Sequence, residues 1–130
     1  MIEAQDLCGR VTLAGAVPND VLGRLYDEAD VFVSASLFEG YGMALAEAMA
    51  RGLPLVASTG GAAAETVPDG AGLKAPPRDT DALRQALRRL IAGSRLRRDL
   101  ADSSWAAGRH LPRWSGTAAT VARVLKGIRP

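Results

Sequence analysis

The sequence predicts an α/β fold in which a small parallel sheet is flanked by helices. The first observation is a pair of short, mostly apolar runs at residues 31–35 and 53–57, which are separated by a helix-forming block at 43–50. Two such runs joined through one helix are typical of a parallel βαβ unit. The second observation is a series of amphipathic helical patterns from about residue 80 onward. With 130 residues, the chain is long enough for one domain with its own core.

The strongest local signals lie in residues 36–58, SLFEGYGMALAEAMARGLPLVAS. An acidic, glycine-containing turn precedes the helix-forming block, Gly52 ends that block, and Pro54 lies just beyond it. The free N–H groups at the start of a helix favour an anion, and glycine lets the backbone come close to a ligand. At about 100° per residue, Glu47 lies about 80° around the helix axis from a helical Glu39. We therefore expect both carboxylates to border one cleft at the carboxyl end of the sheet, where ligands bind in open α/β folds.

Two elements are expected before this segment. Residues 11–14 are predicted to form a short buried strand that Gly15 ends. A helix is predicted to follow from Pro18, with Asn19 or Asp20 as its cap. Four residues at helical spacing predict one apolar face on this helix, namely Leu22, Leu25, Tyr26 and Ala29.

The turn after the second apolar run contains a glycine pair, Gly60-Gly61. The backbone N–H groups of such a pair are suited to a phosphate or a sugar. The alternative is a flexible turn that leads into a helical turn, in which Glu65 caps or pairs locally. The residues alone favour neither interpretation.

The remaining segments predict structural elements. Residues 71–74 are expected to form a short edge strand, and a helix with an apolar stripe is expected to end at Gly93. Two more helices are expected after it, the last one from about residue 115. The two tryptophans, Trp105 and Trp114, are expected to be core or docking anchors.

The pair Glu39-x7-Glu47 resembles the signature of retaining GT-B glycosyltransferases of group 1. It stands inside EGYGMALAEAMARGLPLVA and is followed by the glycine pair, and these surrounding matches carry the resemblance. Taken alone, the two residues have a plainer interpretation, an acidic residue near a helix start and a solvated residue on a helix face. One departure is Ala64, which stands where family members sometimes carry proline before Glu65.

The resemblance implies that residues 1–130 form a single, partial nucleotide-sugar-binding domain. It implies the Rossmann-like C-terminal half of a GT-B fold, truncated at its N-terminal side, because the first βαβ region of that domain lies before Met1 in the family pattern. That region normally brings an Arg and a Lys to the donor phosphates. Arg51 and Lys74 are not expected to replace them, since Arg51 lies at the far end of its helix and nothing places Lys74 nearer.

The resemblance also implies roles for individual residues. Glu39, the candidate catalytic residue, and the amides of residues 40–43 are implied to bind the sugar, and Glu47 to bind the ribose hydroxyls. Val17, in the turn at 15–18, is implied to contact the nucleotide base, the alternative being an ordinary strand-to-helix loop. The donor-binding set implied in this way comprises Glu47, Gly40, Tyr41, Gly42, Met43, Gly60 and Gly61.

The implied function is that of the donor-side domain of a retaining glycosyltransferase, which transfers a sugar from a nucleotide-sugar to an acceptor. The resemblance implies metal independence, with no metal site and no other cofactor. The isolated chain is expected to be inactive, because it has neither the upstream basic pair nor the acceptor-binding domain of the family. Two alternatives stay open, a non-catalytic nucleotide-sugar-binding module and a subunit that a separate acceptor-binding chain completes.

The net charge of +2 hides a division along the chain. Residues 1–83 carry five basic and twelve acidic side chains, whereas residues 84–130 carry eleven basic and two acidic ones. A basic third of this kind suits nucleic acid or an anionic membrane. Because no nucleic-acid-binding motif accompanies the arginines, a solvated helix face is the preferred interpretation. We therefore expect no nucleic-acid partner, and contact with a membrane surface stays open as an alternative.

Association and location can also be predicted. The truncated sheet edge predicts self-association, and an acceptor-binding domain or chain is the other expected protein partner. The first ten residues, MIEAQDLCGR, are polar and acidic, unlike a secretory signal. Cys8 is the only cysteine, expected to be small and partly buried, and it cannot form an internal disulfide. We expect a cytoplasmic protein, with a peripheral position at the inner face of the membrane as an alternative.

Overall fold

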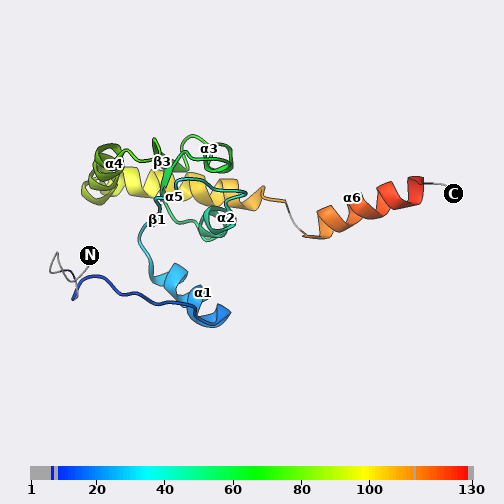
Figure 1. Ribbon diagram of the computed structural model, residues 1–130, viewed down its shortest axis with the longest axis horizontal. Coiled ribbons are helices and arrows are strands. Elements are labelled where there is room, and N and C mark those ends of the chain that lie inside the picture. The colour runs from blue at the N-terminus through cyan, green and yellow to red at the C-terminus, as the bar shows by residue number, and fades with distance from the viewer. Residues whose placement is uncertain (1–6, 8, 113, 129–130) are drawn as a thin grey trace.

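Nine helices and strands make up the computed structural model, which describes residues 7, 9–112 and 114–128 (Figure 1). In chain order they are α1 (Asn19–Glu28), β1 (Phe32–Ser34), α2 (Met43–Ala50), β2 (Leu55–Ser58), α3 (Ala63–Thr66), β3 (Gly72–Ala75), α4 (Thr80–Ala92), α5 (Ser94–Arg109) and α6 (Trp114–Gly127). The expectations for Cys8 and for the first six residues lie outside the described residues.

The three strands form one parallel sheet in the order β1-β2-β3. Phe32 of β1 pairs with Leu55 of β2, and Leu55 pairs with Gly72 of β3. All four residues of the central strand β2 are buried, as expected for a parallel strand with both faces covered. The predicted α/β class, a parallel sheet flanked by helices, is confirmed. The edge strand predicted at 71–74 is also confirmed, one residue further along the chain.

The core lies on both faces of β2, because successive side chains of a strand point to opposite sides. Leu55 packs with Met49 of α2, and both are almost fully buried. Val56 packs on the other side with Leu90 of α4 and Leu100 of α5. α5 runs along the whole body in Figure 1 and contacts both α2 and α4. Each of these large side chains contributes about 1.5–3 kcal/mol by its burial.

The helix predicted at residues 43–50 is confirmed as α2, and two glycines set its ends. Gly42, the N-cap, has a φ of +80°. Gly52, with a φ of +71°, directly follows the C-cap Arg51. Glycine adopts these left-handed conformations without the steric cost that other residues have. The turn before α2 and the turn after it therefore depend on these two residues.

Two predictions near the amino end are wrong. Residues 11–14 do not form a strand, and Leu13 is 81% exposed. A strand needs a neighbour for its N–H and C=O groups, and no strand in the described part pairs with this segment. α1 has Pro18 as its N-cap and no side-chain cap hydrogen bond, so neither Asn19 nor Asp20 caps it.

The apolar face predicted for α1 is only partly buried. Tyr26 is buried and its ring stacks on Phe32, with 5.9 Å between the ring centroids. Ala29 is partly buried against the same core cluster, whereas the two leucines of the predicted face are exposed. One aromatic residue therefore anchors α1 to the sheet.

The carboxyl-terminal helix α6 projects from the body and has no buried residue (Figure 1). Trp114 at its start is 88% exposed, and Trp105 of α5 is 51% exposed. The expectation that these tryptophans are core anchors is therefore wrong, and a docking role stays a prediction. Among the described residues, no helix is both long and apolar enough to cross a membrane.

Candidate functional site

Two loops meet beyond the carboxyl ends of β1 and β2. The backbone N–H of Glu39 donates to the carbonyl of Gly60 at 3.1 Å, and the N–H of Ala62 donates to the carbonyl of Glu39 at 2.8 Å. The Ser58 hydroxyl also donates to the carbonyl of Ser36. These bonds bring Glu39 next to the predicted glycine pair, at the end of the sheet where ligands bind in open α/β folds.

The glycine pair has a structural cause. A Cβ on Gly60 would lie 2.1 Å from the carbonyl oxygen of Leu37, and a Cβ on Gly61 would lie 2.3 Å from the carbonyl oxygen of Glu39. Gly61 also has a φ of +63°, which favours glycine. Close packing of the two loops therefore accounts for both glycines. Contact of Gly60 and Gly61 with a ligand stays a prediction.

The amino end of α2 carries no side-chain cap. Its N-cap is Gly42, so the first N–H groups of the helix, beginning with that of Met43, are not taken by a capping side chain. The Thr66 hydroxyl donates to the carbonyl of Tyr41 at 3.0 Å and supports the turn. A Cβ on Gly40 would meet nothing within 4 Å, so the space beside this residue is free. This arrangement suits an anion at the start of α2.

Glu47 lines a groove of about 770 Å³ on the outer side of α2. The groove lies between α2 and the junction of α5 and α6, and Glu47 and Arg109 are its charged residues. Its aromatic residues are Tyr41, Trp105 and Trp114. Apolar and aromatic walls with a few polar groups are typical of small-molecule sites.

The structure brings only part of the predicted site together in this groove. Tyr41, Met43 and Glu47 share it. Glu39 does not line it but lies in the loop before α2, so the two carboxylates do not border the same groove. Val17 does not line it either and is half-buried just before α1. The role predicted for each of these residues stays a prediction.

A contact between α1 and α2 lies beside Glu47. Arg51 Nη1 is 2.5 Å from Asp27 Oδ1 and also donates to the carbonyl of Gly23. The Arg51 guanidinium lies 5.3 Å from the ring centroid of Tyr26. Burial raises the pKa of Tyr26, the charge of Glu47 and its hydrogen bond raise it further, and the charge of Arg51 opposes them. Sequence reasoning missed this contact, because its residues lie more than 20 positions apart in the sequence and no local pattern joins them.

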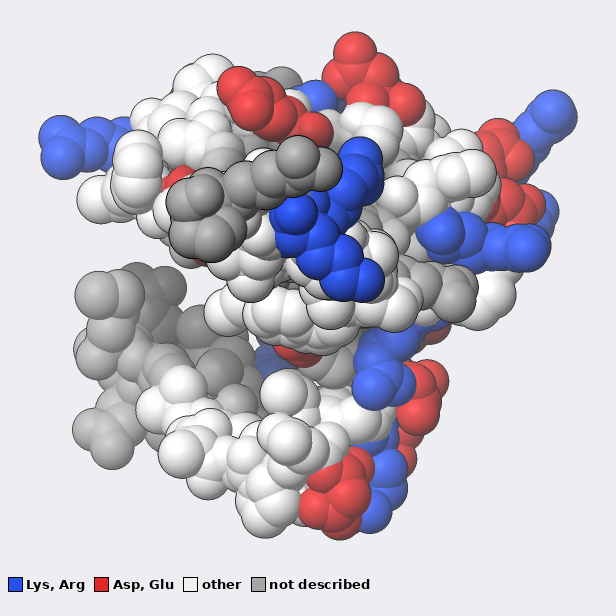
Figure 2. All heavy atoms as spheres, turned by 90° about the vertical axis from the view of Figure 1, so that its right-hand side faces the viewer, with Lys and Arg blue, Asp and Glu red and all other residues white. Residues whose placement is uncertain are grey.

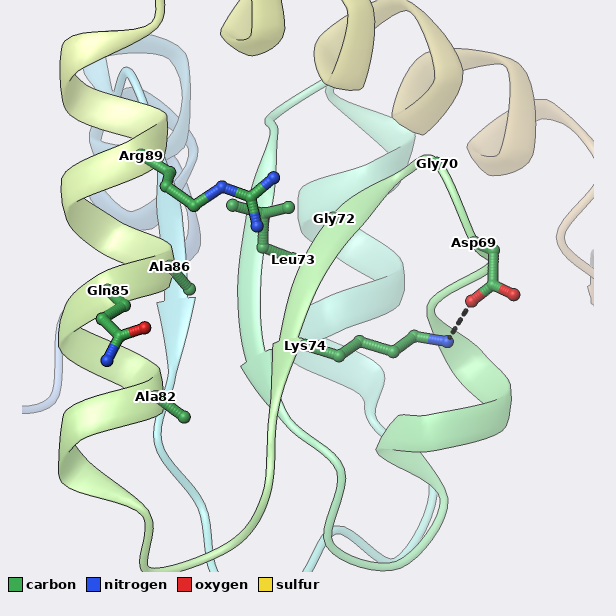
Figure 3. Close-up of a pocket in the computed structure, with 9 residues that line it drawn as sticks. All are labelled: Asp69, Gly70, Gly72, Leu73, Lys74, Ala82, Gln85, Ala86 and Arg89. Carbon is green, nitrogen blue, oxygen red and sulfur yellow. Dashed lines mark hydrogen bonds and ion pairs between the residues drawn. The ribbon is translucent and has the colours of Figure 1, made fainter.

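A second cavity, of about 410 Å³, lies between β3 and α4 and contains none of the predicted site residues (Figure 3). Lys74 points away from α4 and donates to Asp69 at 2.9 Å and to the carbonyl of Ala64 at 3.1 Å. Arg89 extends from α4 towards Leu73 of β3 (Figure 3). Lys74 and Arg51, the two basic residues considered as substitutes at the donor phosphates, are thus each held by an aspartate.

The remaining charged side chains are dispersed. The chain has one Asp-x-Asp pair, Asp79 and Asp81. The carboxylate of Asp79 caps α4 by accepting from the N–H of Ala82. Asp81 forms an ion pair with Arg84 at 2.7 Å. Within residues 7, 9–112 and 114–128, no three His, Cys, Asp or Glu side chains gather in a way that could hold a metal ion. On the face shown in Figure 2, basic side chains form several separate groups, most of them next to acidic ones.

The sequence matches the family described as "Glycosyl transferases group 1" over residues 2–93. It is 36% identical over 121 residues to the MMP alpha-(1->4)-mannosyltransferase of Mycolicibacterium hassiacum. That match covers 91% of this chain and 29% of the relative. The chain therefore spans less than a third of the length of this curated relative.

Solved glycosyltransferase structures have the same fold. Sucrose-phosphate synthase from Thermosynechococcus elongatus matches with a TM-score of 0.87 and 31% identity, over 97% of this chain and 32% of that one. Anabaena HepE in complex with UDP matches with a TM-score of 0.85 and 24% identity, over 98% of this chain and 35% of HepE. The C-terminal domain of LpcC from Francisella tularensis, a group 1 protein, matches with a TM-score of 0.73 and 26% identity. That match covers 82% of this chain and 55% of the LpcC domain structure. The chain belongs to the group 1 glycosyltransferase family, and its fold is that of the C-terminal domain of GT-B members.

Proposed function

We propose that this domain holds the nucleotide-sugar donor of a retaining glycosyltransferase. The observation that carries the proposal is the start of α2, which lacks a side-chain cap and has Glu39 just before it and Glu47 within its second turn. Membership of the group 1 family supports the proposal. The fold of HepE, which was solved in complex with UDP, supports it as well.

In this proposal, the start of α2 holds the diphosphate. The macrodipole and the uncapped N–H groups stabilise its charge, and Gly40 and Gly42 let the backbone approach it. Glu47 accepts hydrogen bonds from the ribose hydroxyls, as a carboxylate with two oxygens can. Glu39 and the amides that follow it bind the sugar, which makes Glu39 the candidate catalytic residue of this chain.

The proposed reaction of the complete enzyme is transfer of the sugar with retained anomeric configuration. The bond between the anomeric carbon and the phosphate oxygen breaks, and a bond to the acceptor oxygen forms. The proton of the acceptor hydroxyl leaves with the diphosphate. Fixed N–H dipoles at the start of α2 stabilise the charge that develops on the leaving group, so the proposal includes no metal ion. Another domain or chain holds the acceptor.

Titration calorimetry with UDP, GDP and ADP tests this proposal. We expect binding of at least one nucleotide, and a loss of about 1.5–3 kcal/mol of binding free energy for Glu47→Ala, because a hydrogen bond to a charged group is removed. Glu28→Ala is the matched control, since Glu28 is an exposed glutamate, the last residue of α1, and does not line the groove. Equal losses in the two variants would contradict the proposed role of Glu47, and no binding of any nucleotide would contradict the donor site.

A further inference from the structure

The cavity of about 410 Å³ between β3 and α4 is separate from the proposed donor site (Figure 3). Its walls come from the turn before β3, from β3 and from α4, and none of the residues assigned to the donor lines it. Leu55 of β2 packs with α2, whereas Val56 packs with α4, so these two helices cover opposite faces of the sheet. The cavity is therefore a second place on this domain with room for a small molecule.

Four polar side chains line this cavity, namely Asp69, Lys74, Gln85 and Arg89, and together they carry a net charge of +1. Asp69 and Lys74 neutralise each other in an ion pair of 2.9 Å. Lys74 also donates to the carbonyl of Ala64 and points away from α4 (Figure 3). Arg89 is therefore the remaining positive charge of the cavity.

Arg89 has no ion pair within the described residues. No acidic residue stands three or four positions from it, so its own helix supplies no partner. The carbonyls of Leu90 and Ile91, at the end of α4, accept from Arg97. The side chain of Arg89 extends towards Leu73 of β3 (Figure 3). Its guanidinium is thus available to a ligand in the cavity.

The wall beside Arg89 is apolar. Ala82, Ala86 and Arg89 follow one another at intervals of four and three residues, so they lie on one face of α4. Leu73 lines the cavity from β3 (Figure 3). Gln85 lies one turn before Arg89, and its amide carries two N–H donors. A positive group beside an apolar wall suits a small anion that carries an apolar chain.

We propose that this cavity binds a small carboxylate with a short apolar chain, and that Arg89 holds the carboxylate. The planar guanidinium binds a carboxylate through two parallel hydrogen bonds. The net charge of +1 matches a monoanion. A phosphate monoester carries about −1.5 to −2 charges at pH 7 and would also lie near the carboxylate of Asp69. This site does not depend on the proposed donor function.

Titration with butanoate, followed by amide NMR, tests the chemical class of the ligand. Butanamide is the neutral ligand of the same shape, acetate lacks most of the apolar chain, and inorganic phosphate is the competing anion. We expect butanoate to shift the amides of residues 70–74 and 82–89, acetate to bind about threefold more weakly, and butanamide to shift them little. Equal binding of butanoate and butanamide, or tighter binding of phosphate than of butanoate, would overturn the proposal.

Arg89→Gln tests the residue, and Arg88→Gln is the matched control. Both arginines are exposed on α4, but Arg88 does not line the cavity. We expect Arg89→Gln to weaken butanoate about tenfold, because hydrogen bonds to a charged group are lost, and Arg88→Gln to leave its binding unchanged. The amide spectra show that both variants are folded. Equal affinities of the two variants for butanoate, or shift changes centred outside residues 70–74 and 82–89, would overturn the site.

Discussion

At the scale of single residues, we expect the charge that Glu47 offers to a ligand to depend on Asp27, through the ion pair of Asp27 with Arg51. Arg51, the C-cap of α2, pairs with Asp27 and not with Glu47, although it follows Glu47 by four residues, a spacing at which ion pairs commonly form. The Asp27 side chain is 67% exposed and that of Arg51 is 39% exposed, so their ion pair contributes only about 0–1 kcal/mol to stability. We attribute to this pair an electrostatic effect on the groove and a small effect on the free energy of unfolding.

Asp27→Ala should weaken nucleotide binding about twofold, because the released Arg51 can then pair with Glu47. The matched control is Asp20→Ala, which removes another exposed α1 aspartate from an ion pair, in that case with Arg24. Calorimetry gives the two affinities, and thermal unfolding shows whether both variants remain folded. Equal affinities of the Asp27 and Asp20 variants would show that Arg51 does not compete for Glu47.

At the scale of elements, the buried Ser104 ties α5 to the sheet. Its hydroxyl donates to the carbonyl of Leu53, just before β2, at 2.6 Å, and its side chain is fully buried. Ser104→Ala removes the donor from a buried carbonyl and should lower the free energy of unfolding by about 1–3 kcal/mol. Ser103→Ala, at the exposed neighbouring position, is the control and should change it little. Urea denaturation of both variants is the measurement, and equal stabilities would refute the role of this bond.

The elements also show which parts of the fold could be predicted. α2 was predicted with its observed bounds because its signals are local, an acidic glycine turn before it and Gly52 and Pro54 after it. The strand expected at 11–14 was wrong, because a strand forms only where a neighbour supplies hydrogen-bond partners. The Glu39-x7-Glu47 motif could be predicted for the same reason, because both residues lie in one short segment of the sequence. The contact of Arg51 with Tyr26 and Asp27 joins the end of α2 to α1, and no local sequence pattern predicts it.

At the scale of the whole molecule, β1 forms one edge of the sheet, and Val33 at its centre is 43% exposed. An unpaired strand edge is a template for pairing with another chain. We expect the chain to self-associate through this edge, and Val33→Lys to shift the equilibrium towards the monomer. Val124→Lys, on the exposed surface of α6, tests α6 as the contact instead. Sedimentation measures both, and a stable monomer at high concentration would disprove self-association.

The isolated chain should not release nucleotide from UDP-, GDP- or ADP-sugars. Positioning of an acceptor against a donor can supply roughly 7–11 kcal/mol of rate enhancement, and the proposed function assigns the acceptor to another domain or chain. Arg51 and Lys74 are each held by an aspartate, so neither is a free counter-charge for the diphosphate. Nucleotide release over hours is the assay, with a Glu39→Ala, Glu47→Ala double variant as the control. Release well above that control would show that the chain is a competent enzyme.

The central claim is that the donor binds at the start of α2, and a titration followed by amide NMR tests it most directly. The spectra of the chain are recorded with UDP, GDP and ADP, and again for Glu47→Ala. We expect the largest shift changes at residues 40–47 with at least one nucleotide, and much smaller changes in a folded Glu47→Ala variant. Shift changes that are absent from residues 40–47 with all three nucleotides would contradict the claim.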